Sequence, residues 1–574
     1  MIASVLLKKY QRRFIHLTSQ APRTLWEVTL PLIPSTLITI LNGGTRTLNP
    51  RDITWLASDN FTSYIAQRYY LSAPWQFPLA ANSDYGLENS TSLTYTGPNL
   101  FLLIPHKILQ LNPSYQFFGI WILVNIYLQV FIGMRIAKRF SKSISVGFVF
   151  GALTITPFLL NRMQMHLWLI SHFLILWGIL IVVKFHQSRQ FSYWQITGLI
   201  ICSYVINIYL LAMVLIILAS WMCYLVLSKE KFRVEISKVL VHTALPLLTC
   251  LVLLDGALFR SAPYESARSL LTPTYGAHPA NLLTFIQGDT GLPSDLNSSW
   301  GDFPQQFSSV RNSFGHIEGD YEGYSYLGLG LLLLIASGIL VLIRKNSFKQ
   351  IIYQYCIYLA AGVGVWLFAI TYRVGIGGLE FKLPFLLYFN YALSLFRSSG
   401  RFMWVIAYAL LVIAFIVLAQ LLSSRQLNLL LVSVLIIQCA DLALPQVDRF
   451  TYTKQYTATQ YSVTTEESKR FSELSRDMKV VRYWPQQNVP TGWGYISLLS
   501  VENELMTDGV YTSRPNFIEM RRVESTSKKQ LCSNLLQQKT LYVVPKEKVS
   551  LLLECGMVLK PELNIREVAI FKSN

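Results

Sequence analysis

The sequence is poor in charged residues, and in acids above all. Only 14% of its 574 residues are charged, against about 25% in an ordinary soluble protein. Hydrophobic residues make up 52% of the chain. So few charges cannot cover the surface of a soluble protein of this length. The composition therefore predicts a polytopic α-helical membrane protein.

Cysteine is also scarce, with seven residues in the whole chain. Five of them lie in apolar runs and are interpreted as small core residues: Cys202, Cys223, Cys250, Cys356 and Cys439. Cys532 and Cys555 lie in a polar C-terminal part, where an oxidising compartment would permit a disulfide. The sequence has no C-x-x-C, no H-E-x-x-H and no glycine-rich phosphate loop, so neither a zinc site nor a nucleotide site is predicted.

Basic residues outnumber acidic ones by 49 to 31, which gives a formal net charge of +18. A basic excess can indicate nucleic-acid binding. Here, however, the bases lie in short clusters between apolar runs, such as Lys138, Arg139 and Lys142, as in cytoplasmic loops under the positive-inside rule. We therefore exclude nucleic acid as a partner and place the N-terminus in the cytoplasm.

The apolar runs predict about eleven spanning helices, most of them close to the ~20 residues that a crossing needs. The runs are Leu25–Leu41, Tyr115–Ile136, Val146–Leu160, His166–Val183, Trp194–Tyr209, Leu211–Leu227, Val239–Leu258, Tyr326–Ile343, Ile351–Tyr372, Phe402–Leu422 and Leu427–Leu444. A cleaved signal peptide is the competing interpretation of the first run, but a small-x-small cleavage site is absent. The residues from Asn99 to Gln110 predict a helix lying on the membrane interface.

Residues 1–445 are therefore assigned to a transmembrane domain. Eleven crossings that start from a cytoplasmic N-terminus put the outer loops 43–99 and 259–324 outside the cytoplasm. From Pro445 onward, polar residues replace the apolar runs. Glu466–Met478 is predicted to be a helix, while Lys479–Tyr483, Thr540–Val544 and Arg566–Phe571 are rich in β-forming residues. Residues 446–574 therefore predict a small extracytoplasmic α/β domain.

The first outer loop carries acids at the rim of the membrane domain. Asp52 and Asp59 follow the first span closely, and Tyr64 and Arg68 come at helical spacing in DNFTSYIAQRYY. A carboxylate at this place can act as a general base toward a hydroxyl at the membrane surface. The alternative is that Asp59 caps the N-terminus of the helix that follows it.

Basic residues recur at the outer ends of two predicted spans. Arg162 and His166 are four residues apart and share a helix face, where anionic lipid groups can reach them. His172 lies deeper, which indicates either a polar cavity or a histidine bound by a neighbouring helix. Arg397 and Arg401 are one turn apart where the tenth span begins. Two guanidiniums there suit a phosphate, although arginines also snorkel to headgroups without a specific ligand.

The second outer loop ends in three acids, Glu318, Asp320 and Glu322, just before the eighth span. Carboxylates in such a group can bind a divalent cation or sugar hydroxyls. A run of acids can also be only a solvated face. We predict substrate-binding roles for Glu318 and Glu322 and no metal ligands or cofactor, with a divalent cation as the alternative.

These motifs resemble the GT-C superfamily of integral-membrane glycosyltransferases, which use polyprenyl-phosphate sugars, and in particular a poorly characterised bacterial branch of it. The resemblance rests on segments that follow in the same order through most of the membrane part: WLASDNFTSYIAQRYYLSAPWQFPL, YTGPNLFLLIPHKIL, FFGIWILVNIYLQ, HLWLISHFLILWG, YEGYSYLGLG and FRSSGRFMW. An exported C-terminal domain also fits the superfamily's architecture.

The resemblance implies an inverting transferase that moves a hexose or pentose from a polyprenyl-phosphate donor to an extracytoplasmic glycan or lipid-linked acceptor. The superfamily keeps an essential acid in its first outer loop, and the matching position is Asp59, which is therefore expected to be the general base. Four cations are expected to stabilise the leaving lipid phosphate: Arg397, Arg401, Arg162 and His166. Further residues are expected to contact substrate: Asp52, Tyr64, Arg68, His172, Glu318 and Glu322.

The sequence departs from the oligosaccharyltransferase members of the superfamily, in which a W-W-D-like triplet is expected in the soluble domain. Trp484 and Trp493 form no such triplet, which argues against an asparagine acceptor. The expected location is a bacterial inner membrane, with membrane lipids as neighbours and a role in surface-polysaccharide assembly in the cell envelope.

Two other classes of protein remain open. A flippase or transporter for lipid-linked sugars usually shows paired repeats and ionisable residues at the membrane midplane, whereas this chain keeps most of its charges at helix ends. A non-catalytic envelope-assembly protein would have no need of Asp59, Arg397 and Arg401 together.

Overall fold

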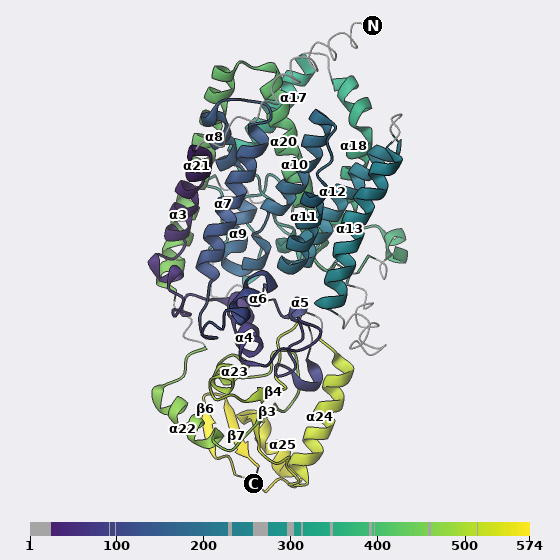
Figure 1. The fold of residues 1–574 in the computed structure, drawn as a ribbon. Helices are drawn as coiled ribbons and strands as arrows, with labels where there is room; N and C mark the ends of the chain where they lie inside the picture. The colour runs from purple at the N-terminus through teal and green to yellow at the C-terminus, as the bar shows by residue number, and fades with distance from the viewer. Residues whose placement is uncertain are drawn as a thin grey trace.

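The structure is a computed structural model that describes residues 25–90, 92–97, 99–227, 232–255, 274–294, 304–310, 314–344, 348–389, 393–394, 396–456, 461–513, 515–558 and 560–573. The basic residues before the first predicted span lie outside these ranges. So do residues 256–273, which hold the end of the span predicted at Val239–Leu258 and the start of the second outer loop. Figure 1 shows a helical bundle, a layer of short helices below it and a small domain at the bottom.

Six helices of the described residues are long and apolar enough to cross a membrane. They are α7 (Phe118–Ala137), the segment Leu167–Ser188 with α10 (Phe173–Ser188), α12 (Ile208–Leu227), α13 (Arg233–Leu253), α20 (Met403–Leu421) and α21 (Ser424–Gln455). Shorter apolar helices occupy other predicted spans: α2 (Leu25–Thr29) with α3 (Leu32–Leu41), α11 (Tyr193–Ile206), α17 (Leu329–Arg344) and most of α18 (Phe348–Ile370). The membrane-protein class is confirmed, while the number of eleven crossings stays a prediction.

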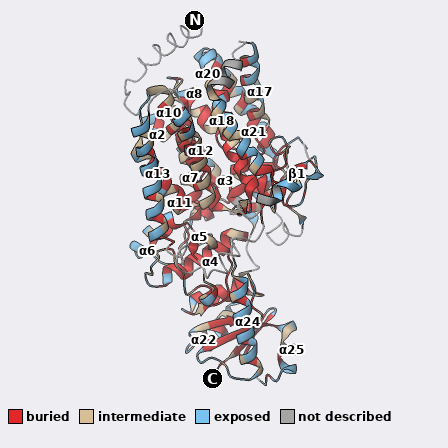
Figure 2. Cartoon of the chain, turned by 90° about the vertical axis from the view of Figure 1, so that its right-hand side faces the viewer, coloured by how far each residue is buried: buried red, intermediate tan, exposed pale blue. Residues whose placement is uncertain are grey.

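Burial separates the central helices of the bundle from the peripheral ones. In the apolar window of Leu167–Ser188, 72% of the residues are buried inside the protein, against 22% in that of Arg233–Leu253. Figure 2 shows this difference, with exposed residues along α13. The exposed side chains of α13 include Leu245 and Leu248, and such an apolar surface requires lipid rather than water as its solvent.

The span predicted over Val146–Leu160 is broken in the structure. Helix α8 (Ile144–Leu153) and helix α9 (Pro157–Met165) meet at an angle of 59°. Pro157 supplies no backbone N–H, and the residue before a proline is disfavoured in the helical region; Thr156 is accordingly extended. The bend directs the C-terminal end of α9 toward the second outer loop.

Helix α21 continues to Gln455, eleven residues beyond the predicted end of its span at Leu444. Pro445 lies inside this helix without ending it, as neighbouring helices allow in membrane proteins. The extension carries Arg449, which is buried and donates to the Asn161 side chain of α9 at 3.3 Å. The last helix of the bundle is therefore packed against the bent pair.

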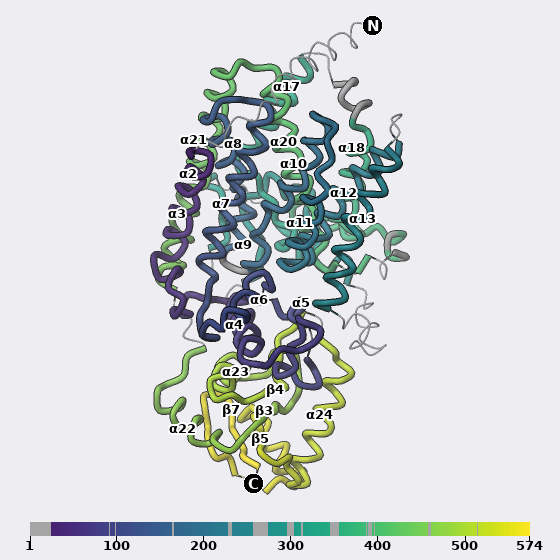
Figure 3. Tube along the Cα trace, in the orientation of Figure 1, coloured from purple at the N-terminus to yellow at the C-terminus, as the bar shows by residue number. Residues whose placement is uncertain are grey.

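The first outer loop forms a layer of helices between the bundle and the C-terminal domain, as the Cα trace in Figure 3 shows. Helix α4 (Ser58–Ser72) is buried along almost its whole length, because it is covered on both sides. Helix α6 (Leu100–Ile108) occupies the predicted interface segment, and the Asn99 side chain caps it by accepting from the amide of Phe101.

The C-terminal part is a small α/β domain, as predicted. Its sheet has the strand order β4 (Met506–Thr507), β3 (Val480–Tyr483), β5 (Thr540–Pro545), β7 (Val568–Lys572) and β6 (Leu563–Ile565). The strand β3 is parallel to β4 and β5, whereas β7 is antiparallel to β5 and β6. The helices are α22 (Thr465–Ser475), α23 (Trp493–Glu502), α24 (Phe517–Cys532) and α25 (Val549–Glu554). All six residues of β5 are buried, so this strand is the centre of the domain core.

A disulfide joins Cys532 at the end of α24 to Cys555 just after α25, with the two Cα atoms 5.3 Å apart. This pairing confirms the prediction made from the cysteine positions. The other five cysteines are free.

The C-terminal domain is bound to the first outer loop through backbone hydrogen bonds. The amide of Gly86 donates to the carbonyl of Thr507 at 2.7 Å, and the amide of Thr507 donates to the carbonyl of Asp84 at 3.0 Å. Arg482 of β3 forms ion pairs with Glu88 at 2.8 Å and with Asp508 at 3.3 Å. These contacts fix the domain over α4.

Candidate active site

Asp59 lies in the first turn of α4, where its carboxylate has two partners from distant parts of the chain. Its Oδ2 is 2.8 Å from Nδ1 of His166, and its Oδ1 accepts a hydrogen bond from the Tyr511 hydroxyl at 3.1 Å. The N-cap of α4 is Ala57, and its side chain makes no capping bond. The hypothesis that Asp59 is a helix cap is therefore wrong. The Asp59 side chain is 25% exposed.

Glu322 is the centre of the neighbouring charge cluster. It lies in the short helix η4 (Asp320–Gly323) and is buried. Its Oε2 is 2.8 Å from Nη1 of Arg162 and 2.8 Å from Nη2 of Arg401. Its Oε1 is 3.4 Å from Nε2 of His166, so the imidazole lies between Glu322 and Asp59. The structure thus brings five of the predicted residues into one connected cluster.

The backbone explains why these residues meet. The bend at Pro157 carries Arg162 on α9, and His166 is the C-cap of that helix. Arg401 lies in the short helix η6 (Ser399–Phe402). A Cβ atom at Gly400 would lie only 2.7 Å from the Cα of Gly323, so the close approach of η6 to η4 requires a glycine at position 400.

The ion pairs determine the protonation of the cluster. Burial alone would raise the pKa of Glu322, but Arg401 and Arg162 hold it well below its ordinary range. Burial likewise opposes the charging of His166, yet the carboxylates of Asp59 and Glu322 raise its pKa above the usual value. The imidazole is therefore suited to donate from both ring nitrogens.

Arg397 differs from the other two arginines. It is exposed, and no described residue forms an ion pair or hydrogen bond with it. Its charge nevertheless acts on the hydroxyls of Tyr511 and Tyr321, so it lies beside the cluster. Arg162 and Arg401, by contrast, have side chains that are only 1% and 10% exposed and share one carboxylate. The cationic group open to a ligand is thus Arg397.

Three predicted residues of the first outer loop lie away from Asp59. The Tyr64 hydroxyl donates to the carbonyl of Ser114 at 2.9 Å and accepts from Arg68 at 3.2 Å. Asp52 accepts from the amide and hydroxyl of Thr54 in a local turn. No contact joins these side chains to Asp59 within the described ranges, although helical spacing suggested that Tyr64 and Arg68 would lie beside it.

His172 and Glu318 also lie outside the cluster. His172 is buried, with Nδ1 3.0 Å from the Tyr408 hydroxyl and its ring 4.5 Å from that of Trp404. The Nδ1 contact matches the alternative that a neighbouring helix binds the histidine, whereas the buried Nε2 has no hydrogen-bond partner among the described residues. Glu318 is exposed, while Asp320 accepts from Asn281 and from the amide of Ile317. The part of the chain that the structure describes has no group of three or more side chains suited to a metal ion.

Sequence reasoning missed two residues of the site. Tyr511, in the C-terminal domain, donates to Asp59 across 452 positions of sequence. The ring of Tyr209 lies 4.7 Å from the guanidinium of Arg401 and is a cation–π partner. The sequence gives no signal for the contact of Tyr511, because neither spacing nor periodicity relates it to the first outer loop.

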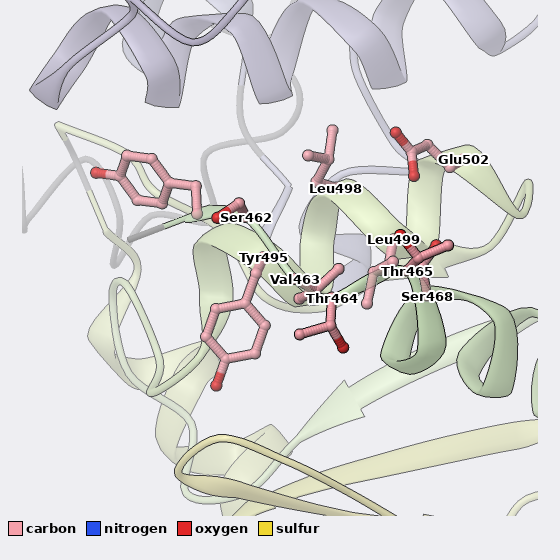
Figure 4. Close-up of a pocket in the computed structure, with 10 residues that line it drawn as sticks. Ser462, Val463, Thr464, Thr465, Ser468, Tyr495, Leu498, Leu499 and Glu502 are labelled. Carbon is pink, nitrogen blue, oxygen red and sulfur yellow. The ribbon is translucent and has the colours of Figure 1, made fainter. Parts of the chain in front are cut away.

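A cavity of about 330 Å³ lies apart from this cluster, between α22 and α23 of the C-terminal domain (Figure 4). Its lining includes Thr464, Thr465, Ser468, Tyr495 and Glu502 and none of the predicted site residues. The candidate site is therefore identified by its charges and contacts, not by this cavity.

Comparison with known proteins gives two solved structures that align with nearly the whole chain. ArnT from Cupriavidus metallidurans bound to undecaprenyl phosphate is 10% identical, with 96% of this chain and 98% of that chain covered and a TM-score of 0.42. The archaeal oligosaccharyltransferase AglB from Archaeoglobus fulgidus, in complex with an inhibitory peptide and a dolichol-phosphate, is 11% identical, with 92% and 70% covered and a TM-score of 0.42.

No curated protein matches the chain. Residues 32–443 match the family described as a domain of unknown function, DUF6311, and this match spans the bundle and both outer loops. The protein is therefore a member of the DUF6311 family.

Proposed function

We propose that this protein is an inverting glycosyltransferase that moves a hexose or pentose from a polyprenyl-phosphate donor to an extracytoplasmic glycan or lipid-linked acceptor. The observation that carries the proposal is the partly exposed carboxylate of Asp59, which His166 joins to Glu322 and its two arginines, with the exposed Arg397 beside this cluster. A base beside a cationic site is the arrangement that transfer from a lipid phosphate requires. The resemblance to the GT-C superfamily supports the same reaction.

In this reaction the acceptor hydroxyl gives its proton to Asp59 while its oxygen attacks the anomeric carbon. The bond between that carbon and the phosphate oxygen breaks, and the lipid phosphate leaves with the electron pair. Attack from the face opposite the phosphate inverts the anomeric centre. His166 holds the Oδ2 atom of Asp59 and so fixes the direction in which the carboxylate accepts the proton.

The leaving phosphate is expected to meet Arg397 first. Arg162 and Arg401 already share Glu322, so most of their charge is balanced within the protein. Three arginines nevertheless face only two carboxylates, Asp59 and Glu322, and the site keeps a positive excess. Arg397 is the exposed member and can turn its guanidinium to a phosphate without breaking an ion pair to a described residue.

The assay that tests the function follows a ¹⁴C-labelled sugar from a polyprenyl-phosphate donor into any other product, soluble or lipid-linked, that forms with cell-envelope extract and separates from the donor by chromatography. A panel of hexosyl and pentosyl phosphates of undecaprenol serves as the donor. Purified parent protein in lipid vesicles should transfer label from one of them. Label that crosses the vesicle membrane but stays on the lipid would favour the flippase instead.

Arg397→Gln should lower transfer by about 10- to 100-fold, the scale of one lost charge-assisted contact. The loss should appear as a higher KM for the donor, and Arg397→Lys should recover part of it. Lys382→Gln is the matched control, because it removes one cation from an exposed side chain of the same outer region. Equal losses for Arg397→Gln and Lys382→Gln would show that only the overall surface charge matters.

The orientation of the chain follows from its basic clusters. Arg135 and Lys138 lie at the end of α7, away from the exported domain. The positive-inside rule then places this end in the cytoplasm and the Asp59 cluster outside. A reporter fused after Asn574 should be active only in the extracytoplasmic compartment. Cytoplasmic reporter activity would contradict the proposed orientation.

A further inference from the structure

Tyr511 enters the site from a short segment that is held tightly against the first outer loop. Its amide donates to the Tyr85 hydroxyl at 3.0 Å, and the amide of Ser513 donates to the carbonyl of Tyr95 at 2.8 Å. Thr512 and the Asn488 side chain exchange two hydrogen bonds of 3.0 Å. The hydroxyl of Tyr511 is therefore delivered to Asp59 by a backbone that is fixed independently of it.

The chemistry of this hydroxyl restricts what it can do. The charge of Asp59, together with burial, raises the pKa of Tyr511 well above its ordinary value. Tyr511 is then a hydrogen-bond donor at all relevant pH values and not a base. Removal of the hydroxyl would leave the ring, its contact with Trp493 at 6.2 Å and the backbone bonds unchanged.

We propose that Tyr511 is a positioning residue through which the exported domain completes the active site; this inference rests on the proposed function. With His166 on Oδ2 and Tyr511 on Oδ1, both oxygens of the Asp59 carboxylate have a donor. Two fixed donors hold the plane of the carboxylate. Each oxygen keeps a further lone pair, and the exposed part of Asp59 presents one of them to the acceptor hydroxyl.

This role differs from that of an inhibitory contact. An inhibitory hydroxyl would occupy the place of the acceptor, and its loss would raise the rate. A positioning hydroxyl lowers the cost of reaching the reactive geometry, and its loss lowers kcat while the donor binds as before. The two roles predict changes of opposite sign for the same variant.

The test is Tyr511→Phe in the full-length protein in vesicles, assayed with the ¹⁴C-labelled donor that the parent uses. We expect kcat to fall by about tenfold or more, with KM for the donor unchanged. Tyr69→Phe is the matched control, since its hydroxyl bonds the carbonyl of Ser497 at 3.3 Å in the same interface, away from Asp59. It should transfer at close to the parent rate.

A second measurement separates positioning from a general effect on folding. In the Asp59→Asn background the change Tyr511→Phe should cause no further loss, because there is no base left to position. Tyr85→Phe, which withdraws the acceptor of the Tyr511 amide, should give a smaller loss of kcat by the same route.

The outcomes are distinct. A parent protein that transfers sugar, with Tyr511→Phe equal to it or faster, would overturn this inference and leave the proposed function standing. Equal losses for Tyr511→Phe and Tyr69→Phe, or additive losses with Asp59→Asn, would also overturn it. A parent protein that transfers no sugar from any donor of the panel would instead overturn the proposed function, and the inference with it.

Discussion

Asp59→Asn should lower sugar transfer by about 10²-fold or more, the usual scale for a lost general base. The asparagine keeps the size of the side chain and one oxygen that can accept from His166 or Tyr511. It loses the negative charge, one of the two acceptor oxygens and the ability to take the proton of the acceptor. Expression, folding and donor binding should therefore stay near those of the parent, and the loss should lie in kcat, measured with the labelled donor in vesicles.

Asp52→Asn is the control for this prediction, because the Asp52 carboxylate bonds Thr54 in a local turn and lies outside the charge cluster. It should have little effect on transfer. If Asp59→Asn transfers sugar at the parent rate, another acid is the base, and Asp84, Glu88 and the acids of the second outer loop are the next to replace.

Glu322→Gln should destabilise the protein by about 3–5 kcal/mol, the scale for removing one partner of a buried ion pair. The side chains of Arg162 and Arg401 are 1% and 10% exposed, and both rely on the Oε2 atom of Glu322. A neutral amide leaves both guanidiniums buried without a compensating charge. The apparent Tm of the purified protein, measured at fixed lipid and detergent, should fall accordingly.

Glu380→Gln tests whether any lost carboxylate has this effect. Glu380 pairs with Arg373 on the hairpin of β1 (Arg373–Ile376) and β2 (Leu379–Lys382), and its side chain is 25% exposed. A pair at the surface contributes only about 0–1 kcal/mol, so this variant should stay close to the parent. A Tm for Glu322→Gln as high as that for Glu380→Gln would mean that the two buried arginines have another counter-charge.

The helices and strands that could be predicted well from the sequence are those that depend on local composition. The apolar runs coincide with helices because a membrane span must satisfy its backbone within the segment. The strands β3, β5 and β7 lie within or overlap the β-rich runs, since their side chains form a core on both faces of the sheet. The helix break at Pro157 could have been predicted from the sequence, because the residue before a proline is disfavoured in the helical region.

The members of the candidate site were predictable only in part, and their connections were not. Asp59, Arg162, His166, Glu322 and Arg401 were singled out from the sequence and lie together in the structure, yet the sequence contains nothing that says Glu322 would bind both arginines. Helical spacing likewise could not predict that Arg68 donates to the Tyr64 hydroxyl, or that Tyr64 donates to the carbonyl of Ser114. Such pairings depend on tertiary packing between segments that are far apart in the chain.

The bridge between Tyr85 and Thr507 has a consequence for biosynthesis. The strand β4 is the edge of the sheet in the C-terminal domain, and the chain around Tyr85 covers it. An uncovered edge invites pairing with other chains. The ribosome makes the chain from its N-terminus, so the first outer loop emerges long before its partner strand. The loop must therefore wait until nearly the whole chain has been made, and a ribosome that stops before Thr507 releases a protein whose bundle is complete but whose Asp59 lacks its partner Tyr511.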